Sequence, residues 1–481
     1  MKERTGGRLL IAGTGSGCGK TTVMCGLLYG LKQRGLRVAS YKCGPDYIDP
    51  MFHREVLGIP SGNLDSFFTP EDVLCSVMDK SCREADLTLI EGVMGYYDGI
   101  GMTARGSSHE IAEITGTPAV LVVNGRGMAN SVGALLRGFL SYGKNGSSTI
   151  KGVVFNQISE KMYPKLAALA EKEGIRPLGF LPRQSIFSMQ SRHLGLIRPE
   201  EMRDFQNKLA GLYEIIKNTI DWKGLLELSK EADVSHSIIP GKTPAENGRV
   251  YRIGIARDEA FCFIYEDNLR YLREKNCELI FFSPLRDEKV PEEIDGLILY
   301  GGYPELYAKE LSENRSMRRS VRNRIAGGLP CIAECGGYLY LQKELADEHG
   351  NCYEMAGVLP GSGKKGSGLK HFGYVEVGLN PDRTLFGKEN ICFRAHEFHY
   401  YDCESGRGDF TAVKASGEGS WQTGFASDTL YGGFPHIYYC GNETFVDAFL
   451  DQCAKYHRNK PQKAMANGEP DQGSTICDKT E

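Results

Sequence analysis

Residues 13–22 read Gly13-Thr14-Gly15-Ser16-Gly17-Cys18-Gly19-Lys20-Thr21-Thr22, and this stretch decides the fold of the first half of the chain. An apolar run, residues 9–12, precedes it, and a stretch with helical spacing follows it and ends near Gly35. Successive glycines let backbone N–H groups converge on phosphate oxygens, and the following helix adds the positive end of its dipole. A strand, a glycine-rich loop and a helix in this order predict a site for nucleotide phosphates.

The loop and the first helical turn supply the predicted ATP-binding residues. Lys20 can reach the outer phosphates, and the Thr21 hydroxyl suits Mg²⁺. The spacing departs from the usual G-x-x-x-x-G-K-[ST] pattern, because the first glycine position holds Thr14 and Gly13 comes one residue too early. A glycine-rich turn that binds nothing is the alternative. The predicted set is Gly13, Thr14, Gly15, Gly17, Gly19, Lys20, Thr21 and Thr22.

Apolar runs with strand character alternate with helical stretches through the first half of the chain. Strands alternating with helices indicate a parallel sheet covered on both faces. Such sheets bind ligands at the carboxyl ends of their strands, where the glycine loop also lies. The further predicted strands are residues 38–41, 87–90, 119–123 and 152–155.

Acidic residues close to the phosphate loop predict a metal and acyl-acceptor site. Glu91 ends an apolar strand, and together with Thr21 and Asp65 it forms the predicted Mg²⁺ site. Each acid taken alone could equally be a helix cap or a solvated turn residue. The sequence does not assign a separate role to each acid. The predicted substrate and acyl-phosphate residues are Lys42, Asp46, Tyr47, Asp49 and Asp98.

A second alternating series follows a polar segment that contains Pro240, Gly241 and Pro244. We therefore expect two α/β domains, over residues 1–231 and 250–457, joined by a linker over 232–249. The series turns to strand-rich hairpins from about residue 355 to 440. The end of the chain, 458–481, is polar and is expected to be disordered.

A thiol lies on a sharp turn in the second series. Residues 331–337 read Cys331-Ile332-Ala333-Glu334-Cys335-Gly336-Gly337, an apolar strand that leads into glycines and a helix. Small residues permit the strand-to-helix elbow that exposes a nucleophile. We expect the helix N-terminus to lower the pKa of the Cys335 thiol. An inert buried thiol is the alternative.

A nucleophilic thiol needs a base and an oxyanion hole. His436 follows a short strand near residues 429–431 and is the preferred base, whereas structural hydrogen bonding is the preferred role for His396 and His399. Gly301 and Gly302 follow another apolar strand, so their backbone N–H groups are the predicted oxyanion hole. The chain as a whole then combines a phosphate site with a carbonyl-attacking thiol, which suggests ATP-driven amidation fed by ammonia from glutamine.

The bulk composition excludes several classes of function. The 481 residues are 41% hydrophobic and 25% charged with a net charge of −4, so neither nucleic acid nor a membrane is an expected partner. The N-terminus lacks a signal-peptide apolar region, and the 15 cysteines do not show zinc-site spacing. We expect a cytoplasmic protein with small-molecule partners; a homodimer is one assembly left open.

The chain resembles the cobyrinic acid a,c-diamide synthases over roughly residues 8–455. The resemblance depends on the phosphate loop and on the runs Lys42-Cys43-Gly44-Pro45-Asp46-Tyr47-Ile48-Asp49-Pro50, Glu91-Gly92-Val93-Met94-Gly95, Ala333-Glu334-Cys335-Gly336-Gly337 and His396-Glu397-Phe398-His399-Tyr400. It implies a P-loop domain similar to dethiobiotin synthetase, which shares the altered loop spacing, and a C-terminal class I glutamine amidotransferase-like domain.

The resemblance implies Cys335 as glutaminase nucleophile and His436 as its base. A Glu usually follows that His by two places, and this chain has Tyr438 there, as the corrinoid branch commonly lacks the Glu. The partner that orients His436 is therefore unassigned. The implied reaction is ATP·Mg²⁺-dependent amidation of the a and c acetates of cobyrinate through an acyl phosphate, in cobalamin biosynthesis.

Other functions stay open at this point. The same chemistry could act on hydrogenobyrinate or nickel sirohydrochlorin, since each presents acetates on a large macrocycle. Cobyric acid synthase is a third candidate, against which the Cys-Gly-Pro-Asp-Tyr-Ile-Asp run at 43–49 argues. A non-enzymatic ATP switch with a decayed amidotransferase domain is a fourth, against which Cys335 and His436 argue.

Overall fold

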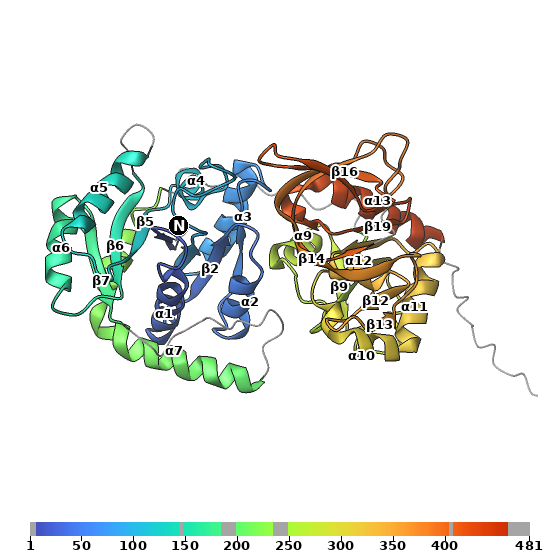
Figure 1. Cartoon of the computed structure of the whole chain (residues 1–481), viewed down its shortest axis with the longest axis horizontal. Helices are drawn as coiled ribbons and strands as arrows, with labels where there is room; N and C mark the ends of the chain where they lie inside the picture. The colour runs from blue at the N-terminus through green and yellow to red at the C-terminus, as the bar shows by residue number, and fades with distance from the viewer. Residues whose placement is uncertain (1–5, 144–147, 184–198, 234–248, 404–406, 460–481) are drawn as a thin grey trace, which may run out of the picture.

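The structure is a computed structural model that describes residues 6–143, 148–183, 199–233, 249–403 and 407–459. Two lobes lie side by side, the first blue to green and the second yellow to red (Figure 1). The predicted linker and tail lie largely outside the described residues. Among the residues described, no helix combines the length and apolar character needed to cross a bilayer.

The first lobe is built on a parallel seven-stranded sheet of the described residues, in the order β3-β2-β4-β1-β5-β6-β7. Its central strand β1 runs from Gly7 to Gly13 and is buried along almost its whole length, as a strand covered on both faces must be. The other strands are β2 (Val38–Cys43), β3 (Ser61–Leu64), β4 (Leu87–Glu91), β5 (Ala119–Asn124), β6 (Ile150–Asn156) and β7 (Arg176–Leu181).

Alternate side chains of β1 enter two different apolar cores. Leu9 and Ile11 pack in one core with α1, α7 and α8, whereas Leu10 and Ala12 pack in the other with α3, α4, α5 and α6. The helices are α1 (Lys20–Gln33), α2 (Ile48–Glu55), α3 (Glu71–Glu84), α4 (Ser108–Thr115), α5 (Ser131–Tyr142), α6 (Tyr163–Lys172), α7 (Pro199–Thr219) and α8 (Trp222–Ser229).

The second lobe contains a sheet with the order β18-β19-β11-β10-β8-β9, parallel except at its edge strand β18. Its central strand β11 (Cys331–Glu334) leads directly into α12 (Gly336–Tyr340). The other strands are β8 (Tyr251–Ala256), β9 (Cys277–Phe282), β10 (Gly296–Leu299), β18 (Phe425–Ala426) and β19 (Leu430–Gly433). The remaining helices are α9 (Glu266–Glu274), η2 (Pro304–Tyr307), α10 (Ala308–Glu313), α11 (Arg315–Ala326), η3 (Tyr439–Gly441) and α13 (Glu443–Asn459).

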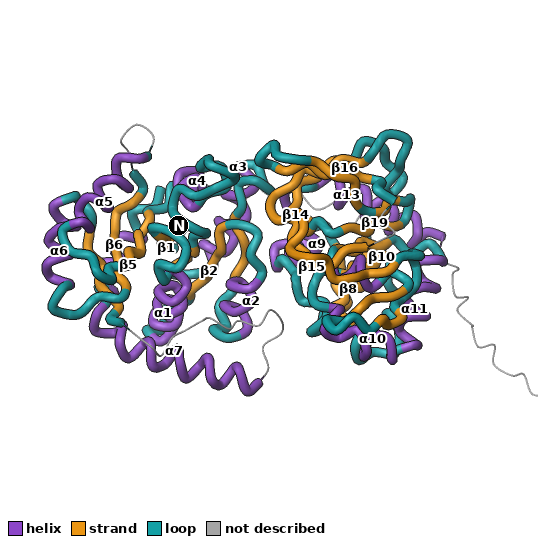
Figure 2. The backbone as a smooth tube through the Cα atoms, viewed as in Figure 1, coloured by secondary structure: helices purple, strands orange, loops and turns teal. Residues whose placement is uncertain are grey.

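A third sheet completes the second lobe, and its two longest strands lie on the side that faces the first lobe (Figure 2). Its main element is the antiparallel pair β14 (Ser362–Leu379) and β15 (Cys392–Cys403). The shorter strands are β12 (Glu344–Ala346), β13 (Cys352–Glu354), β16 (Phe410–Lys414), β17 (Ser420–Thr423) and β20 (His436–Ile437). Because β20 pairs with β15 in the register His396 to His436, this sheet fixes the position of His436.

An aromatic cluster joins the two lobes. Phe67 and Phe68 of the first lobe pack with Tyr265 and Tyr438 of the second, and all four side chains are buried. The Arg394 guanidinium adds a 3.1 Å hydrogen bond to the carbonyl of Phe67. The strands that carry the two predicted reactive loops are thus held in one packed assembly.

Candidate active site

The glycine-rich loop bends sharply between β1 and α1. Gly17 and Gly19 have φ of 75° and 98°, values that favour glycine. A Cβ at Gly17 would meet nothing within 4 Å, so the loop borders open space there. A Cβ at Gly13 would lie 2.4 Å from Cys18 Sγ and 2.8 Å from the Lys20 side chain, so the early glycine gives room for the lysine to cross the loop.

Lys20 extends from the loop toward the β4 end of the sheet. Its Nζ donates to the carbonyl of Gly15 at 3.1 Å and to the carbonyl of Met94. Burial lowers the pKa of Lys20, while the carboxylates of Glu91 and Asp98 act in the opposite direction. Lys20 is therefore surrounded by charged side chains of both signs and does not project into solvent.

Glu91 is the centre of a buried polar network. The Thr21 hydroxyl donates to Glu91 Oε1 at 2.6 Å, and Lys42 Nζ lies 3.2 Å from the same oxygen and 2.6 Å from Asp49 Oδ2. Lys42 and Glu91 are partners in the β2–β4 register, which explains their approach. The second oxygen, Oε2, is buried, has no hydrogen-bond partner among the described residues, and faces His53 Nε2 at 3.8 Å.

The predicted substrate acids occupy different places. Asp46 Oδ1 accepts hydrogen bonds from the backbone N–H groups of Ile48 and Asp49 and so caps the start of α2. Asp98 Oδ2 accepts from the backbone N–H of Gly95 in the turn after β4. The structure thus brings Asp49 into the Glu91 network and leaves the Asp46 and Asp98 carboxylates in turns beside it.

Asp65, a predicted metal ligand, makes hydrogen bonds with residues other than Thr21 and Glu91. Its Oδ1 accepts from the backbone N–H groups of Phe67 and Phe68, and its Oδ2 accepts a 2.7 Å hydrogen bond from the Tyr374 hydroxyl of the second lobe. Burial raises the pKa of Asp65 to about 6. In this conformation Asp65 is an interdomain contact residue.

Cys335 lies at the predicted elbow. Its φ of 46° and ψ of −101° place it at the N-cap of α12 in a strained conformation, and its backbone N–H donates to the carbonyl of Gly433 at 2.7 Å. A Cβ at Gly336 would lie 2.9 Å from the backbone nitrogen of Gly302. The candidate oxyanion loop therefore lies directly against the residue that follows the thiol.

The prediction that the helix N-terminus lowers the thiol pKa is wrong for this structure. Burial raises the pKa of Cys335, with the nearby carboxylate of Glu305 as a further cause. The helix that follows has only five residues, so its dipole is too small to offset the loss of solvation. The resting thiol is neutral, and a base must take its proton.

His436 lies against the oxyanion loop. Its Cε1 would be 2.4 Å from a Cβ at Gly301, so glycine leaves the room that the imidazole occupies. Burial lowers the pKa of His436 to about 3, which keeps the ring neutral but weakens it as a base. From the first lobe, the Tyr47 ring packs against it with centroids 5.4 Å apart.

The two other candidate histidines have different environments. His399 Nε2 lies 2.9 Å from Glu397 Oε1, and its ring stacks on Phe434 at 3.9 Å, as a structural role requires. His396 packs edge-on against Tyr374 and faces the space between the lobes.

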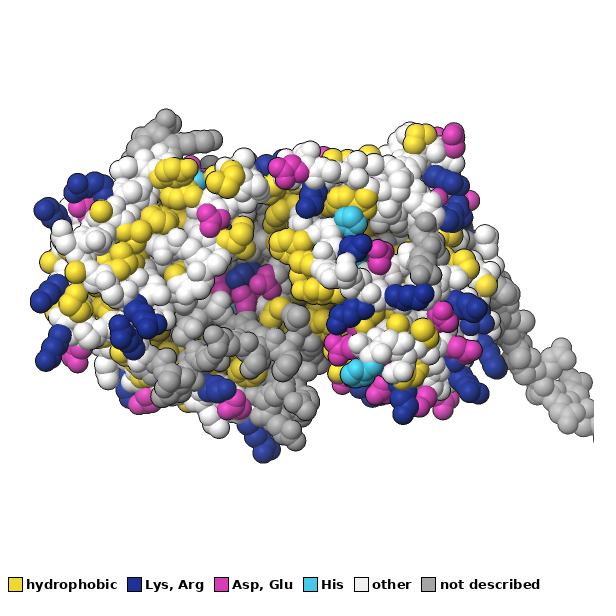
Figure 3. Space-filling model, viewed as in Figure 1, with side chains coloured by type: hydrophobic (Ala, Val, Ile, Leu, Met, Phe, Trp, Pro, Cys, Tyr) yellow, Lys and Arg dark blue, Asp and Glu magenta, His cyan; other side chains and the backbone are white. Residues whose placement is uncertain are grey.

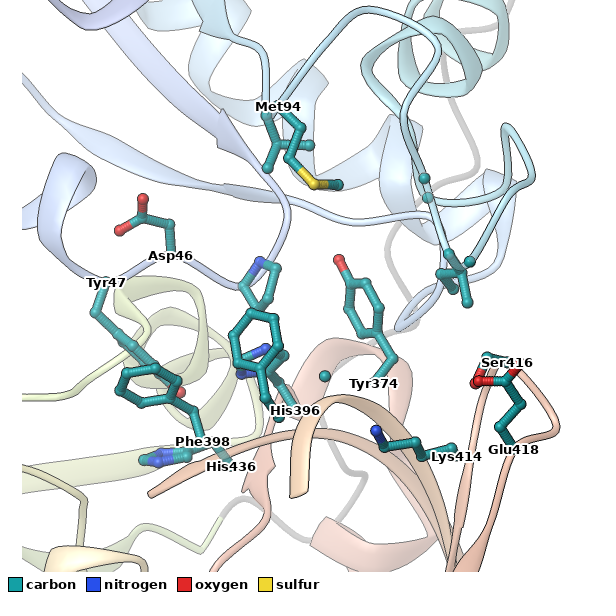
Figure 4. A pocket seen from close by; sticks show the side chains of 18 of the residues that line it. Asp46, Tyr47, Met94, Tyr374, His396, Phe398, Lys414, Ser416, Glu418 and His436 are labelled. Carbon is teal, nitrogen blue, oxygen red and sulfur yellow. The ribbon is translucent and has the colours of Figure 1, made fainter. Parts of the chain in front are cut away.

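A cavity of about 600 Å³ lies between the lobes, with side chains of both in its walls. Figure 3 shows a hollow at their junction with acidic and basic side chains at its floor. In Figure 4, Met94 enters from one side, Asp46 and Tyr47 from a second, and Tyr374 and His396 from a third. The wall also includes Val93, Ile100, Phe263, Phe372, Phe398, Lys414, Glu418 and His436.

Comparison with known proteins agrees with this two-part site. Residues 9–196 match the family described as the CobQ/CobB/MinD/ParA nucleotide binding domain, and residues 252–444 match the CobB/CobQ-like glutamine amidotransferase domain. The cobyrinate a,c-diamide synthase of Caldanaerobacter subterraneus subsp. tengcongensis is 39% identical over 93% of this chain and 99% of its own length.

The chain belongs to the cobyrinate a,c-diamide synthase family. The relative from Priestia megaterium is 36% identical and covers 93% of this chain and 97% of its own. The relative from Thermoplasma volcanium is 34% identical and covers 94% and 98%. Both halves of the chain therefore match together in one protein, which makes it a glutamine-dependent amide-forming ligase by family.

Sequence reasoning about this diamide synthase family member missed three residues of the site. Met94, in the quoted run at 91–95, has φ of 46° and presents its carbonyl to Lys20. His53 lies one helical turn after Asp49, a spacing that could have indicated it. Tyr374 carries no local signal, because its role depends on a contact with Asp65 across 309 residues.

Proposed function

We propose that this protein amidates the a and c acetate carboxylates of cobyrinate with ATP and glutamine, as a step of cobalamin biosynthesis. One observation carries the proposal: a single cavity is lined by His436 of the amidotransferase domain and by Met94, whose carbonyl binds Lys20 of the phosphate loop. A carboxylate held in that cavity has nucleotide activation on one side and an ammonia source on the other.

The chemistry of each half follows from its groups. In the first lobe, transfer of the γ-phosphoryl group of ATP to a substrate carboxylate gives ADP and an acyl phosphate, with Lys20 beside the transferred charge. In the second, Cys335 attacks the glutamine amide carbonyl, ammonia leaves, and water cleaves the thioester to glutamate. Ammonia then displaces phosphate from the acyl phosphate and gives the amide. Two such cycles give the diamide.

The cavity suits a large, partly apolar acceptor. Aromatic side chains in its walls, among them Phe372, Tyr374 and Phe398, offer flat surfaces to a macrocycle. Lys414 also lines it and could pair with a peripheral carboxylate. Asp46 and Tyr47 of the predicted substrate loop border the same space.

The residues at the phosphate loop fit a Mg²⁺ ion. The Thr21 hydroxyl and the Glu91 carboxylate are hard oxygen donors beside the loop, and Glu91 Oε2 is buried with no hydrogen-bond partner from residues that the structure describes. Such an ion usually completes its shell with waters and phosphate oxygens, and it would supply charge neutralisation of the phosphates. Asp65 would be a third ligand only in a conformation in which its hydrogen bond from the Tyr374 hydroxyl is broken.

Mass spectrometry of a reaction with purified protein, cobyrinate, ATP and glutamine tests the proposal. The expected product has two carboxylates converted to amides, and the conversion requires both ATP and a nitrogen source. Parallel reactions with hydrogenobyrinate and nickel sirohydrochlorin decide among the macrocycles. Activity on the nickel compound alone would reject cobyrinate, further amides beyond two would favour cobyric acid synthase, and ATP turnover without amidation would favour the switch.

Assembly and location stay predictions beside this function. A homodimer would give twice the chain mass of 53.2 kDa in light scattering after size exclusion. Cell fractionation of the native host tests the cytoplasmic location.

A further inference from the structure

The base of the glutaminase site lacks the acid that usually orients it. His436 Nδ1 is buried and has no hydrogen-bond partner within the described residues. The residue two places later is Tyr438, whose hydroxyl donates to the carbonyl of Asn63 in the other lobe, 3.1 Å away. Tyr438 therefore makes its side-chain hydrogen bond across the domain interface and does not orient the imidazole of His436.

A carboxyl group approaches the same nitrogen from another strand. Glu334 Oε2 lies 4.0 Å from His436 Nδ1, and the Glu334 side chain is about as buried as the imidazole. The other oxygen, Oε1, is buried and has no hydrogen-bond partner in the part of the chain that the structure describes. Nδ1 is the atom of this approach that lacks a partner among the described residues, and a hydrogen bond from it to the Glu334 carboxyl would remove its desolvation cost.

We infer that Glu334 is the positioning residue of His436 and accepts a hydrogen bond from its Nδ1–H during glutamine hydrolysis. The 4.0 Å separation is longer than a hydrogen bond, so this role requires one of the two side chains to rotate toward the other. Glu334 ends β11 and directly precedes the nucleophile, so the acid comes before Cys335 instead of after the histidine.

The local backbone explains why one ring can serve both groups. Glu334 is paired with Gly433 in the β11–β19 register, and the Cys335 N–H donates to the carbonyl of the same glycine. His436 follows Gly433 by only three residues. An imidazole carries a nitrogen on each side of the ring, so one nitrogen can serve Glu334 and the other Cys335.

The proposed step gives each proton on His436 and Cys335 a defined position. Nδ1–H stays on the ring and points to Glu334, so Nε2 has the free lone pair. The thiol proton of Cys335 moves to Nε2 as sulfur bonds to the amide carbon of glutamine, and the imidazolium then protonates the departing nitrogen. A carboxyl group can accept from Nδ1–H whether or not it is ionised, so the role does not require a charged Glu334 at rest. Burial raises the pKa of Glu334 in this structure.

The inference rests on the glutaminase half of the proposed function, so the test measures glutamate release in the complete reaction. Glu334→Leu removes the acceptor at similar size, and we expect kcat for glutamine to fall on the order of 10²-fold. The KM for glutamine and amidation from free ammonia should stay within about twofold, because neither uses the imidazole. Glu334→Gln keeps an acceptor oxygen, so its kcat for glutamine should be about tenfold higher than that of Glu334→Leu.

A second readout follows the nucleophile itself. The glutamine analogue 6-diazo-5-oxo-L-norleucine alkylates an activated thiol, and its inactivation rate should fall in parallel with kcat. Asp295→Asn is the matched control, since Asp295 is a buried carboxylate that lies 2.8 Å from His457 Nδ1 at the other end of β10 from the site. Its alkylation rate and kcat should equal those of the wild type.

Wild-type kcat in folded Glu334→Gln and Glu334→Leu would overturn the inference, as would equal losses with glutamine and with ammonia. Where the Leu variant does not fold, Glu334→Ala takes its place: an unchanged kcat and alkylation rate in folded Glu334→Ala contradict the positioning role. Absence of glutamate release by the wild type would instead contradict the proposed function.

Discussion

The Tyr438 hydroxyl donates a 3.1 Å hydrogen bond to the backbone carbonyl of Asn63, two residues after the candidate base His436. The backbone N–H of Asn63 in turn donates to Asp267 Oδ2 of the second lobe at 2.8 Å. The end of β3 is therefore held on both sides by the amidotransferase domain. A shift of the nucleotide domain would move the segment that carries the base.

Tyr438→Phe should uncouple the two half-reactions without stopping either. Loss of one hydrogen bond costs about 1 kcal/mol, so the molar ratio of glutamate released to amide formed should rise severalfold. Tyr400→Phe, which removes a hydroxyl from an exposed ring, is the control and should keep the wild-type ratio. An unchanged ratio in Tyr438→Phe would show that this contact does not couple the sites.

Cys335→Ser should abolish glutamine-dependent amidation and leave amidation with ammonium salts close to wild type. Only the ammonia source is lost, because the acyl phosphate forms in the other lobe. Product formation with each nitrogen source is measured by mass spectrometry, with Cys352→Ser, an exposed cysteine, as the control. Equal loss with both sources would contradict the division into two sites.

Lys20→Ala should reduce amidation from glutamine and from ammonia alike, by roughly 10²-fold or more, because it removes a positive charge beside the transferred phosphoryl group. ADP release measures this step directly. Lys32→Ala is the control, since Lys32 lies in the last turn of the same helix and donates to the carbonyl of Leu57. Normal ADP release in Lys20→Ala would remove the loop from the mechanism.

Glu91→Gln should raise the Mg²⁺ concentration needed for half-maximal amidation by about tenfold or more, since it replaces a carboxylate with a weaker neutral donor. The measurement is a Mg²⁺ titration at saturating ATP. Glu71→Gln, on the exposed start of α3, should leave the titration unchanged. An unshifted curve for Glu91→Gln would place the ion elsewhere.

The raised pKa of Asp65 predicts how the free energy of unfolding changes with pH. Its folded pKa of about 6 is raised above the usual 3.8, so its contribution to stability is present below pH 3.8 and is lost as pH rises through 6. The loss is at most about 3 kcal/mol. Asp65→Asn cannot titrate and should gain stability relative to the wild type between pH 4 and pH 7.

Urea unfolding without nucleotide or Mg²⁺, at several pH values, measures that difference. Asp86→Asn is the control, because Asp86 is exposed at the surface and pairs there with Arg37. A stability difference between Asp65→Asn and the wild type that stays constant with pH would contradict the raised pKa.

The central strands and both reactive turns could be predicted from sequence because their signals are local. The apolar run at 9–12 favours a strand, and the glycines at 13–19 favour a turn. Each preference depends only on residues that are close in the sequence. The strand Ser61–Leu64 was not predicted, since Ser-Gly-Asn-Leu has low strand propensity and is held by pairing with β2. The helical region after β7 is divided into α7 and α8, because the side chain of Asp221 caps the start of α8.

The parts of the site that sequence could not supply depend on contacts between distant residues. The pairing of Asp65 with Tyr374 joins two lobes whose sequences are far apart, and no spacing rule connects them. The pKa of Cys335 depends on how deeply the elbow is buried, which the motif around it does not reveal. Burial also decides the protonation of His436.

Because His436 and Met94 face the same hollow, a bound macrocycle would itself block the way out for ammonia. The fraction of ammonia lost to the solvent should then depend on how completely the acceptor fills the cavity. Acceptor analogues that leave a gap would lose ammonia, and analogues that fill the cavity would not. A bound substrate would then itself close the space through which ammonia passes to the acyl phosphate.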